Sequence, residues 1–377
     1  MLNRFLHNIP GWHTKRHLVV FESDDWGSIR MPSLEVFNYL KAQKVPILES
    51  GGYDTCDTLA SNNDLELLMD VLGSIKDSNG NPAKITLNCV MANPDFQSIK
   101  EDNFQNYHYE LFTETLDHYP NHDRAFKLWI EGIHHNLFKP QFHGREHLNV
   151  LMWMTLLRNN VDYVRKAFDS GVFSMEVFSK DDPRRRVLDA FNILNQDESD
   201  YVCNSIREGL VLFERLFGYR SKSMIAPCYT WDEAMEKEAF NNGVVFIQGG
   251  FAQRPSLYAQ TQGARFTHHY TGERNNNKQI YTIRNCFFEP THHEWNNTDS
   301  CFKEIIDSFR LFKPAVVSCH RLNFIGELHP ENRDHNLRSF KRLLKMITDK
   351  YPDVEFVSSD ELGDIIMSSY DKKQKRL

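Results

Sequence analysis

Acidic side chains at the end of an early apolar segment are the first residues whose types could do chemistry. Asp24 and Asp25 close the apolar segment 17–25. Two adjacent carboxylates push their pKa values apart unless a cation keeps one of them ionised. The pair therefore divides naturally into one metal ligand and one general base, although an Asp-Asp pair before a turn can also cap the following helix.

Histidines later in the chain complete a candidate metal site. His143 and His147 are four residues apart, a spacing that on a helical turn places both rings on one face, where they can hold one cation. With an acid from segment 17–25 they leave coordination positions open for water and substrate, as catalytic sites do. The alternative is a pair of solvated loop histidines. His320 follows the apolar segment 315–319 and could protonate a leaving group, or could be a hydrogen-bonded core histidine.

The elements that must position these residues alternate between strand and helix along the whole chain. Apolar segments predict strands at 17–25, 84–93, 139–143, 222–226, 244–250, 280–288, 315–320 and 354–358. This alternation indicates βα units around a parallel sheet, and seven or eight strands suit a closed or nearly closed barrel. A doubly wound open sheet is the competitor, but the sequence lacks the Gly-rich turns of nucleotide-binding folds.

A parallel barrel would bring the candidate residues together, because its catalytic groups lie at the carboxyl ends of the strands. The candidates span most of the sequence, so we expect one domain over residues 1–377. Loop insertions are expected where polar and turn-forming residues gather, at 44–83, 159–200 and 251–280. Three arginines at 184–186 could bind an anion, but a solvated turn is the favoured interpretation.

Composition and charge narrow the class of protein. Of the 377 residues, 41% are hydrophobic and 25% are charged, as in globular proteins. A net charge of −7 without a basic stripe argues against a nucleic-acid partner. The apolar runs are too short for a membrane span, which needs about 20 residues, and no signal peptide is evident. The seven scattered cysteines include no CxxC pair, so we expect reduced thiols and a cytoplasmic protein.

The order of these motifs resembles that of the NodB-type polysaccharide deacetylases, carbohydrate esterase family four. The family's first motif, T-F-D-D, corresponds to 22–25, where the sequence reads E-S-D-D. Its second, H-[ST]-x-x-H-P, corresponds to 143–148 and keeps both histidines without the proline. Its last, L-x-H, corresponds to 318–320 and keeps the histidine. The resemblance covers residues 17–322 in order and implies an α/β fold of the NodB-like deacetylase type, a distorted (β/α)7-type barrel.

Two motifs depart from the family. The third, R-x-P-Y, corresponds to 225–228, which keeps Pro227 but lacks the arginine that tethers the base. Candidates for that tether are Arg254, Arg284 and Arg321. The fourth motif is an Asp-Trp that orients the acidic histidine. Its candidate acids are Glu289 and Glu294, the second of which precedes Trp295.

The resemblance implies metal-assisted removal of an N- or O-acetyl group from a sugar. Asp25, His143 and His147 would hold one divalent cation, and a nitrogen-rich ligand set favours Zn²⁺, with Co²⁺ or Ni²⁺ as alternatives. Asp24 would accept the proton of the attacking water. His320 would protonate the leaving group.

The remaining residues of the candidate site would contact the substrate. A backbone N–H of Cys228 or Tyr229 would stabilise the oxyanion. Three aromatic residues, Trp26, Tyr229 and Trp295, could stack on sugar rings or could equally pack at the rim of the barrel. Two alternatives stay open: a catalytically silent sugar-binding barrel, and a metal-independent glycoside hydrolase. The latter would use carboxylates among Glu22, Asp24, Glu289 and Glu294.

Overall fold

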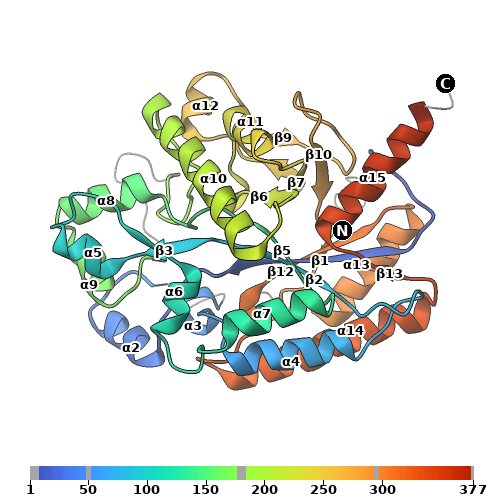
Figure 1. Cartoon of the computed structure of the whole chain (residues 1–377), viewed down its shortest axis with the longest axis horizontal. Coiled ribbons are helices and arrows are strands. Elements are labelled where there is room, and N and C mark those ends of the chain that lie inside the picture. Colours follow the sequence, from blue (N-terminus) through green and yellow to red (C-terminus); the bar gives the residue numbers. More distant parts are fainter. Residues whose placement is uncertain (1–7, 48–51, 176–183, 293–296, 375–377) are drawn as a thin grey trace.

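A parallel sheet runs through the centre of the molecule (Figure 1). The computed structural model describes residues 8–47, 52–175, 184–292 and 297–374. Along the sheet the strands follow the order β10-β7-β6-β5-β2-β1-β12-β11, and every neighbouring pair is parallel. Their bounds are β1 (Leu18–Trp26), β2 (Ile85–Cys89), β5 (Phe138–Phe142), β6 (Ser223–Ile225), β7 (Phe246–Gly249), β10 (Ile280–Ile283), β11 (Cys286–Phe287) and β12 (Ala315–His320). A further strand, β13 (Glu355–Phe356), pairs with the start of β1.

The two ends of this strand order, β10 and β11, belong to one chain segment. The sequence predicts a single strand over 280–288, but the structure divides it into β10, which pairs with β7, and β11, which pairs with β12. At the division, the N–H of Arg284 donates to the carbonyl of Gly249, and the N–H of Asn285 donates to that of Val316. The segment thus changes partners between adjacent residues, and the sheet curls into the predicted distorted barrel.

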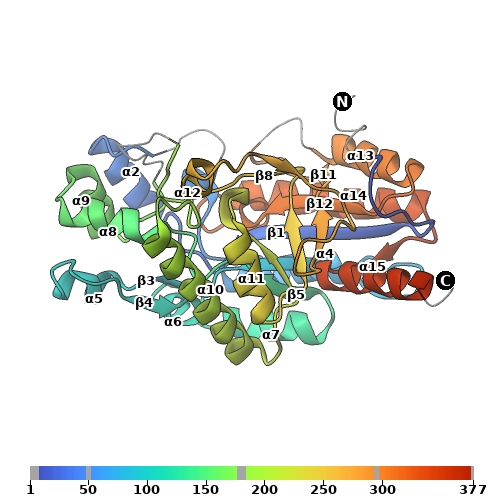
Figure 2. The same ribbon diagram turned by 90° about the horizontal axis from the view of Figure 1, so that it is seen from above.

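Helices cover the outside of the sheet (Figures 1 and 2). They include α4 (Asn62–Gly73), α7 (Ala125–His134), α10 (Gln196–Phe217), α11 (Glu233–Asn241), α13 (Thr298–Arg310), α14 (Pro330–Lys350) and α15 (Ser359–Gln374). Helix α14 shows why such segments are helical and buried on one side. Pro330 is the first residue of the helix, a position at which a backbone N–H would have no partner within the helix, so the N–H that proline lacks is not missed. Leu337, Phe340, Leu344 and Ile347 then recur at helical spacing and are buried.

Other elements connect these layers. They are α2 (Leu34–Ala42), α3 (Tyr53–Cys56), α5 (Phe96–Glu101), α6 (Phe112–Asp117), α8 (Val150–Arg158), α9 (Asp162–Asp169), α12 (Leu257–Thr261), β3 (Ala92–Pro94), β4 (Tyr109–Leu111), β8 (Ala252–Gln253), β9 (Thr267–His268), η1 (Pro227–Tyr229) and η2 (Arg321–Asn323). The expected insertion 44–83 is wrong in part, because it contains α4, which packs against α7 and α14 in the helical layer.

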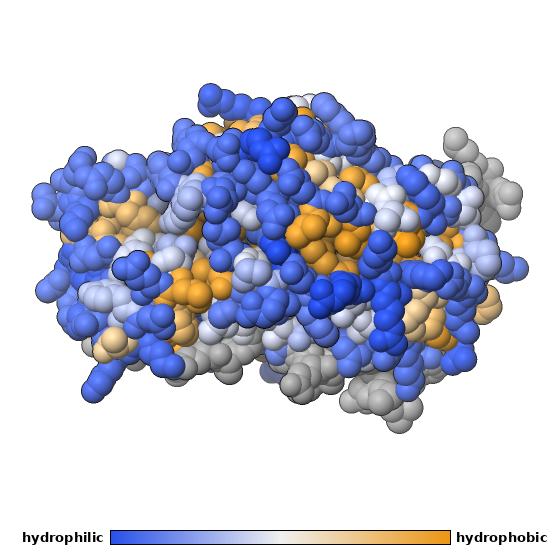
Figure 3. Space-filling view, turned by 90° about the horizontal axis from the view of Figure 1, so that it is seen from below, coloured by the Kyte–Doolittle hydropathy of each residue, from blue (hydrophilic) through white to orange (hydrophobic). Residues whose placement is uncertain are grey.

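The surface is mainly polar on the face shown in Figure 3, where smaller apolar areas lie between hydrophilic side chains. Within the described ranges, no helix is both long enough and apolar enough to cross a bilayer.

Candidate active site

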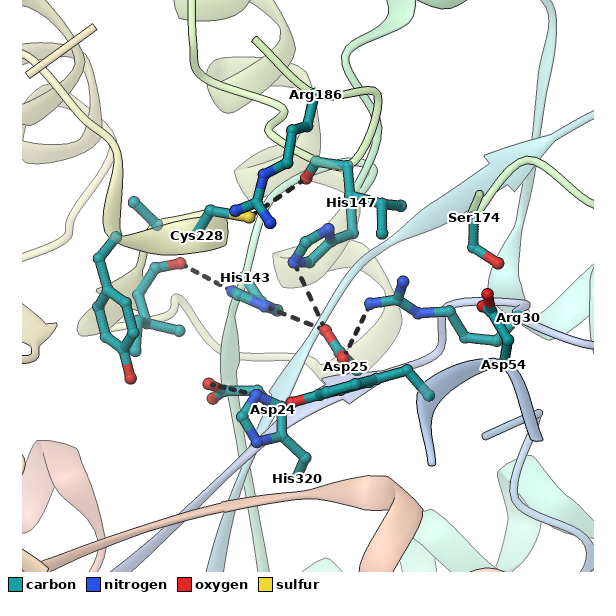
Figure 4. A pocket seen from close by; sticks show the side chains of 15 residues that line it. Asp24, Asp25, Arg30, Asp54, His143, His147, Ser174, Arg186, Cys228 and His320 are labelled. Carbon is teal, nitrogen blue, oxygen red and sulfur yellow. Dashed lines mark hydrogen bonds and ion pairs between the residues drawn. The ribbon is translucent and has the colours of Figure 1, made fainter. Parts of the chain in front are cut away.

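One cavity, with a volume of about 200 Å³, lies at the carboxyl ends of the strands (Figure 4). The described residues that line it include Asp24, Asp25, Arg30, Tyr53, Asp54, His143, His147, Ser174, Arg186, Leu188, Cys228, Tyr229 and His320. The structure therefore brings both aspartates and all three candidate histidines to one place.

A local irregularity of β1 lets both aspartates face this cavity. Side chains on a regular strand alternate between its faces. Here the pairing of β1 with β2 shifts register between Ser23 and Trp26, and Asp25 has a φ of 71°. Trp26 turns inward instead: its side chain is 1% exposed and its ring packs edge-on against Trp129. The predicted stacking of Trp26 on a sugar is wrong, because the ring belongs to the core.

Asp25, His143 and His147 present their ligand atoms to one another. Asp25 Oδ1 lies 3.5 Å from His143 Nε2 and 3.6 Å from His147 Nε2, and one ligand atom of each residue lies within 4.8 Å of the others. Ligands of one tetrahedral zinc ion at about 2.0–2.1 Å are about 3.3–3.5 Å apart. All three side chains are buried. The donor set and its spacing fit a divalent cation.

Hydrogen bonding prepares these histidines for ligation. His143 Nδ1 lies 2.9 Å from the carbonyl oxygen of Ile225, and donation there leaves Nε2 with its lone pair toward Asp25. Burial lowers the pKa of His147 to about 3, so its ring is neutral near pH 7. His147 Nδ1 is buried without a hydrogen-bond partner among the described residues.

The two histidines lie on a loop after β5, so the predicted helical turn is wrong. Gly144 has a φ of 108°, which starts a sharp bend. The carbonyl of Arg145 accepts from the N–H groups of Met91 and Ala92, and this fixes the bend against the end of β2.

The buried charged side chains of Arg145 and Glu146 also hold this loop in place. Arg145 Nε donates to Glu146 Oε1 at 2.5 Å, and its guanidinium lies 4.5 Å from the ring centroid of Tyr109. Ser205, on α10, donates to the other oxygen of Glu146. The residues between the two histidines thus anchor the loop to the neighbouring helix.

Of the three arginines that are candidates for the tether, Arg284 is the one that binds Asp24. Its Nη1 and Nη2 donate to the two carboxylate oxygens of Asp24, each at 2.6 Å, and Asn88 Nδ2 donates to one of them at 2.8 Å. Burial favours the neutral acid, but Arg284 outweighs it and lowers the pKa of Asp24 to about 2. The other two candidate arginines pair elsewhere, Arg254 with Asp189 and Arg321 with Asp57.

His320 is paired with Glu289, the first of the two candidate orienting acids. His320 Nδ1 lies 2.5 Å from Glu289 Oε1, and Asn323 Nδ2 donates to the other carboxylate oxygen at 2.7 Å. Burial opposes the charged ring, yet the carboxylate raises the pKa of His320 to about 9. His320 Nε2 lies 3.9 Å from Asp24 Oδ2. The second candidate, Glu294, and Trp295 lie outside the described residues.

The turn η1 forms the wall of the cavity beside His143. Cys228 and Tyr229 have φ values of 54° and 55°. The N–H of Tyr229 donates to the carbonyl of Ala226, so of the two predicted oxyanion donors the Cys228 N–H is the candidate that remains. The Tyr229 hydroxyl lies 3.2 Å from Arg284 Nη1.

Sequence reasoning missed one charged residue beside the metal ligands. Arg30 is 3% exposed, and its Nη2 donates to Asp25 Oδ2 at 2.9 Å. Burial favours the neutral acid of Asp25. Neighbouring positive charges, chiefly that of Arg30, outweigh burial and hold the pKa of Asp25 well below its usual range. Behind Arg30, Asp57 is bound by Arg321 Nε at 3.0 Å. This position, five residues after Asp25 in an irregular stretch, carries no sequence signal of its own.

Three further residues that sequence reasoning missed line the cavity from connecting segments: Tyr53, Asp54 and Ser174. The expected solvated turn of arginines is also wrong in part. Arg185 is buried and donates to Glu198 at 2.7 Å, while Arg186 lines the cavity.

Comparisons with known proteins give remote matches of structure. No protein-family model and no curated protein matches the sequence. A putative polysaccharide deacetylase from Mycobacterium smegmatis is 10% identical, with 96% of this chain and 94% of that chain covered at a TM-score of 0.48. A probable polysaccharide deacetylase from Pseudomonas aeruginosa PAO1 is 8% identical, with 93% and 91% covered at a TM-score of 0.43.

A third solved structure is a 4-alpha-glucanotransferase from Thermococcus litoralis, 10% identical at a TM-score of 0.44. The match covers 92% of this chain, which spans 40% of the length of that enzyme. Polysaccharide deacetylases, the family that the motifs resemble, are thus among the solved structures that this chain resembles.

Proposed function

We propose that this protein is a metal-dependent hydrolase that removes an acetyl group from a nitrogen or an oxygen of a carbohydrate. The observation that carries the proposal is the convergence of Asp25, His143 and His147 on one point, with Asp24 and His320 beside them. Two imidazoles and one carboxylate favour Zn²⁺, with Co²⁺ or Ni²⁺ as alternatives, and leave a position open for substrate. A bound divalent cation would polarise the acetyl carbonyl and lower the pKa of the attacking water.

Asp24 and His320, the two residues beside the ligand set, each carry out one of the proton transfers. Asp24 is ionised at neutral pH and fixed by Arg284, so it can orient the attacking water and accept its proton. His320 is protonated at neutral pH because of Glu289, so it can donate to the leaving nitrogen or oxygen. Water adds to the carbonyl carbon, the bond to the sugar breaks, and acetate and the free amine or alcohol leave.

The same cavity offers the oxyanion a donor and excludes part of the solvent. The Cys228 N–H belongs to the turn that forms one wall, and Leu188, Ile225 and Ala226 line the cavity with apolar surface. In such an environment a hydrogen bond to developing charge is stronger than in water.

A metal-independent glycoside hydrolase fits the geometry less well. That chemistry needs two carboxyl groups facing one substrate. Glu22 is fully buried within the barrel, where it binds Arg284 and Ser359. Glu289 is committed to His320, so neither of these glutamates is available to form a catalytic pair with Asp24.

Metal analysis combined with acetate release tests the proposal. The purified protein is expected to hold about one divalent ion per chain, and Asp25→Ala and His147→Ala are expected to lose it. His122→Ala is the matched control, because His122 is also buried but binds backbone carbonyls elsewhere. Acetate release from small N-acetyl and O-acetyl sugars should stop with chelator and return with Zn²⁺.

Two outcomes would contradict the proposal. Full hydrolysis in metal-free protein would favour metal-independent chemistry. Tight metal binding without release of acetate from any acetylated sugar would indicate a catalytically silent sugar-binding barrel.

A further inference from the structure

A polar wall of the cavity has no part in the proposed reaction. Asp54, on α3, and Ser174, after α9, both line the cavity and are 3% and 1% exposed. In the view of Figure 4 both are drawn beyond Arg30, away from Asp24 and His320. Both residues come from segments between the strands of the barrel, 44–83 and 159–200, and not from strand ends.

The hydroxyl of Ser174 is the informative atom of this wall. Its Oγ is buried without a hydrogen-bond partner among the described residues. Buried polar atoms in folded proteins are nearly always paired, and an exception calls for a reason. Since the side chain lines the cavity, a ligand hydroxyl or amide there would complete the missing hydrogen bond.

The charges around this wall favour a neutral ligand group. Asp54 and Arg30 line the same side of the cavity (Figure 4). Arg30 also contacts Asp25 and lies 3.6 Å from Asp57, so its charge is already balanced by carboxylates. A carboxylate that accepts and a hydroxyl that both donates and accepts match the hydroxyl groups of a sugar ring.

We propose that Asp54 and Ser174 form a hydroxyl-binding subsite for the sugar ring whose acetyl group is cleaved. The inference rests on the proposed function. It adds that the choice of substrate depends on hydroxyl groups of the sugar ring, which bind to residues of the connecting segments 44–83 and 159–200. A site built to bind a hydroxyl rejects an analogue without it, because the buried Ser174 hydroxyl is then left unpaired.

A comparison of two amides tests the subsite with the unmodified, metal-loaded protein. N-acetylglucosamine and N-cyclohexylacetamide carry the same amide on a six-membered ring, but only the first has ring hydroxyls. The sugar is expected to have the higher kcat/KM by at least about 100-fold. Equal kcat/KM for the two amides would overturn the proposal.

Variants then assign the preference to the two residues. Ser174→Ala should reduce the sugar-to-cyclohexyl ratio of kcat/KM by about threefold to tenfold, and Asp54→Asn by about tenfold to 100-fold, as for neutral and charged hydrogen bonds. Ser170→Ala is the matched control, since Ser170 lies on the same segment and its hydroxyl donates to the carbonyl of Lys166. An unchanged ratio in both folded variants would overturn the assignment.

Binding of glucosamine by calorimetry separates failure of the subsite from failure of the proposed function. If no acetate is released but glucosamine binds, and binds more weakly to the Ser174→Ala and Asp54→Asn variants, the hydrolase proposal falls and the subsite stands. If N-cyclohexylacetamide is hydrolysed and glucosamine does not bind, the subsite falls and the metal-dependent amide chemistry stands.

Discussion

The protonation of His320 depends on a single carboxylate, which makes Glu289→Gln the sharpest test of its role. The substitution keeps the shape of the side chain and an oxygen that can accept from the ring, but it removes the charge. Burial opposes the imidazolium in both proteins, and Glu289 is the main reason why the pKa of His320 rises from 6.5 to about 9. Without that charge the pKa should return to 6.5 or lower.

The size of the effect follows from the titration. At pH 8 the protonated fraction of His320 should fall from about nine-tenths in the wild type to about 3% in the variant, a loss of about thirtyfold. At pH 5.5 the wild-type ring is almost fully protonated and the variant ring is about nine-tenths protonated. The ratio of variant to wild-type kcat should therefore rise by about thirtyfold as the pH falls from 8 to 5.5. Protonation of Asp24 or of the ligands affects both proteins alike and cancels in this ratio.

The assay is acetate release at saturating metal and substrate, with NMR titration of the His320 ring as a readout that needs no activity. Asp353→Asn is the control, because it removes a carboxylate 2.9 Å from another histidine, the partly buried His17. A kcat ratio that stays constant with pH, or equal pKa values of His320 in both proteins, would refute the reasoning.

Three other variants probe the supports of the site. Arg284→Gln leaves Asp24 buried without its cation and should destabilise the protein by about 3–5 kcal/mol in urea unfolding, and an unchanged midpoint would contradict this. Arg30→Gln removes the hydrogen bond that orients Asp25 and should weaken metal binding about tenfold to 100-fold in competition with a chromophoric chelator, whereas equal affinity would exclude an orienting role. Gly144→Ala puts a Cβ 3.0 Å from a backbone oxygen at a φ of 108° and should cost about 1–3 kcal/mol, with a lower metal content; wild-type stability would show that the bend tolerates a side chain.

The fold could be predicted in outline because its signals are local. The apolar segments 17–25, 139–143 and 315–320 appear as β1, β5 and β12 within a few residues of the predicted bounds. Their alternation with helices predicts a parallel sheet, since parallel strands need a helical crossover. The division of 280–288 into β10 and β11 has no such signal, because it depends on which strands lie on either side.

Orientation at the site could be predicted only in part. A strand end places Asp24 and Asp25 at the rim, but the side to which each carboxylate turns depends on the register shift against β2. The same irregularity sends Trp26 into the core. The bend at Gly144, and with it the loop geometry of His143 and His147, is stabilised by backbone contacts with the end of β2.

By itself, the sequence determined which residue types stand at the ends of the strands: the aspartate pair after the first, the histidines after the third and His320 after a late one. These positions follow from hydrophobic patterning within a few residues. Only the tertiary structure decided the partners, such as Arg284, 260 positions from Asp24 along the chain, and Glu289 beside His320. The physical reason is that a buried charge is satisfied by whichever opposite charge the curled sheet brings within hydrogen-bond distance. The curling of the sheet depends on contacts between residues far apart in sequence.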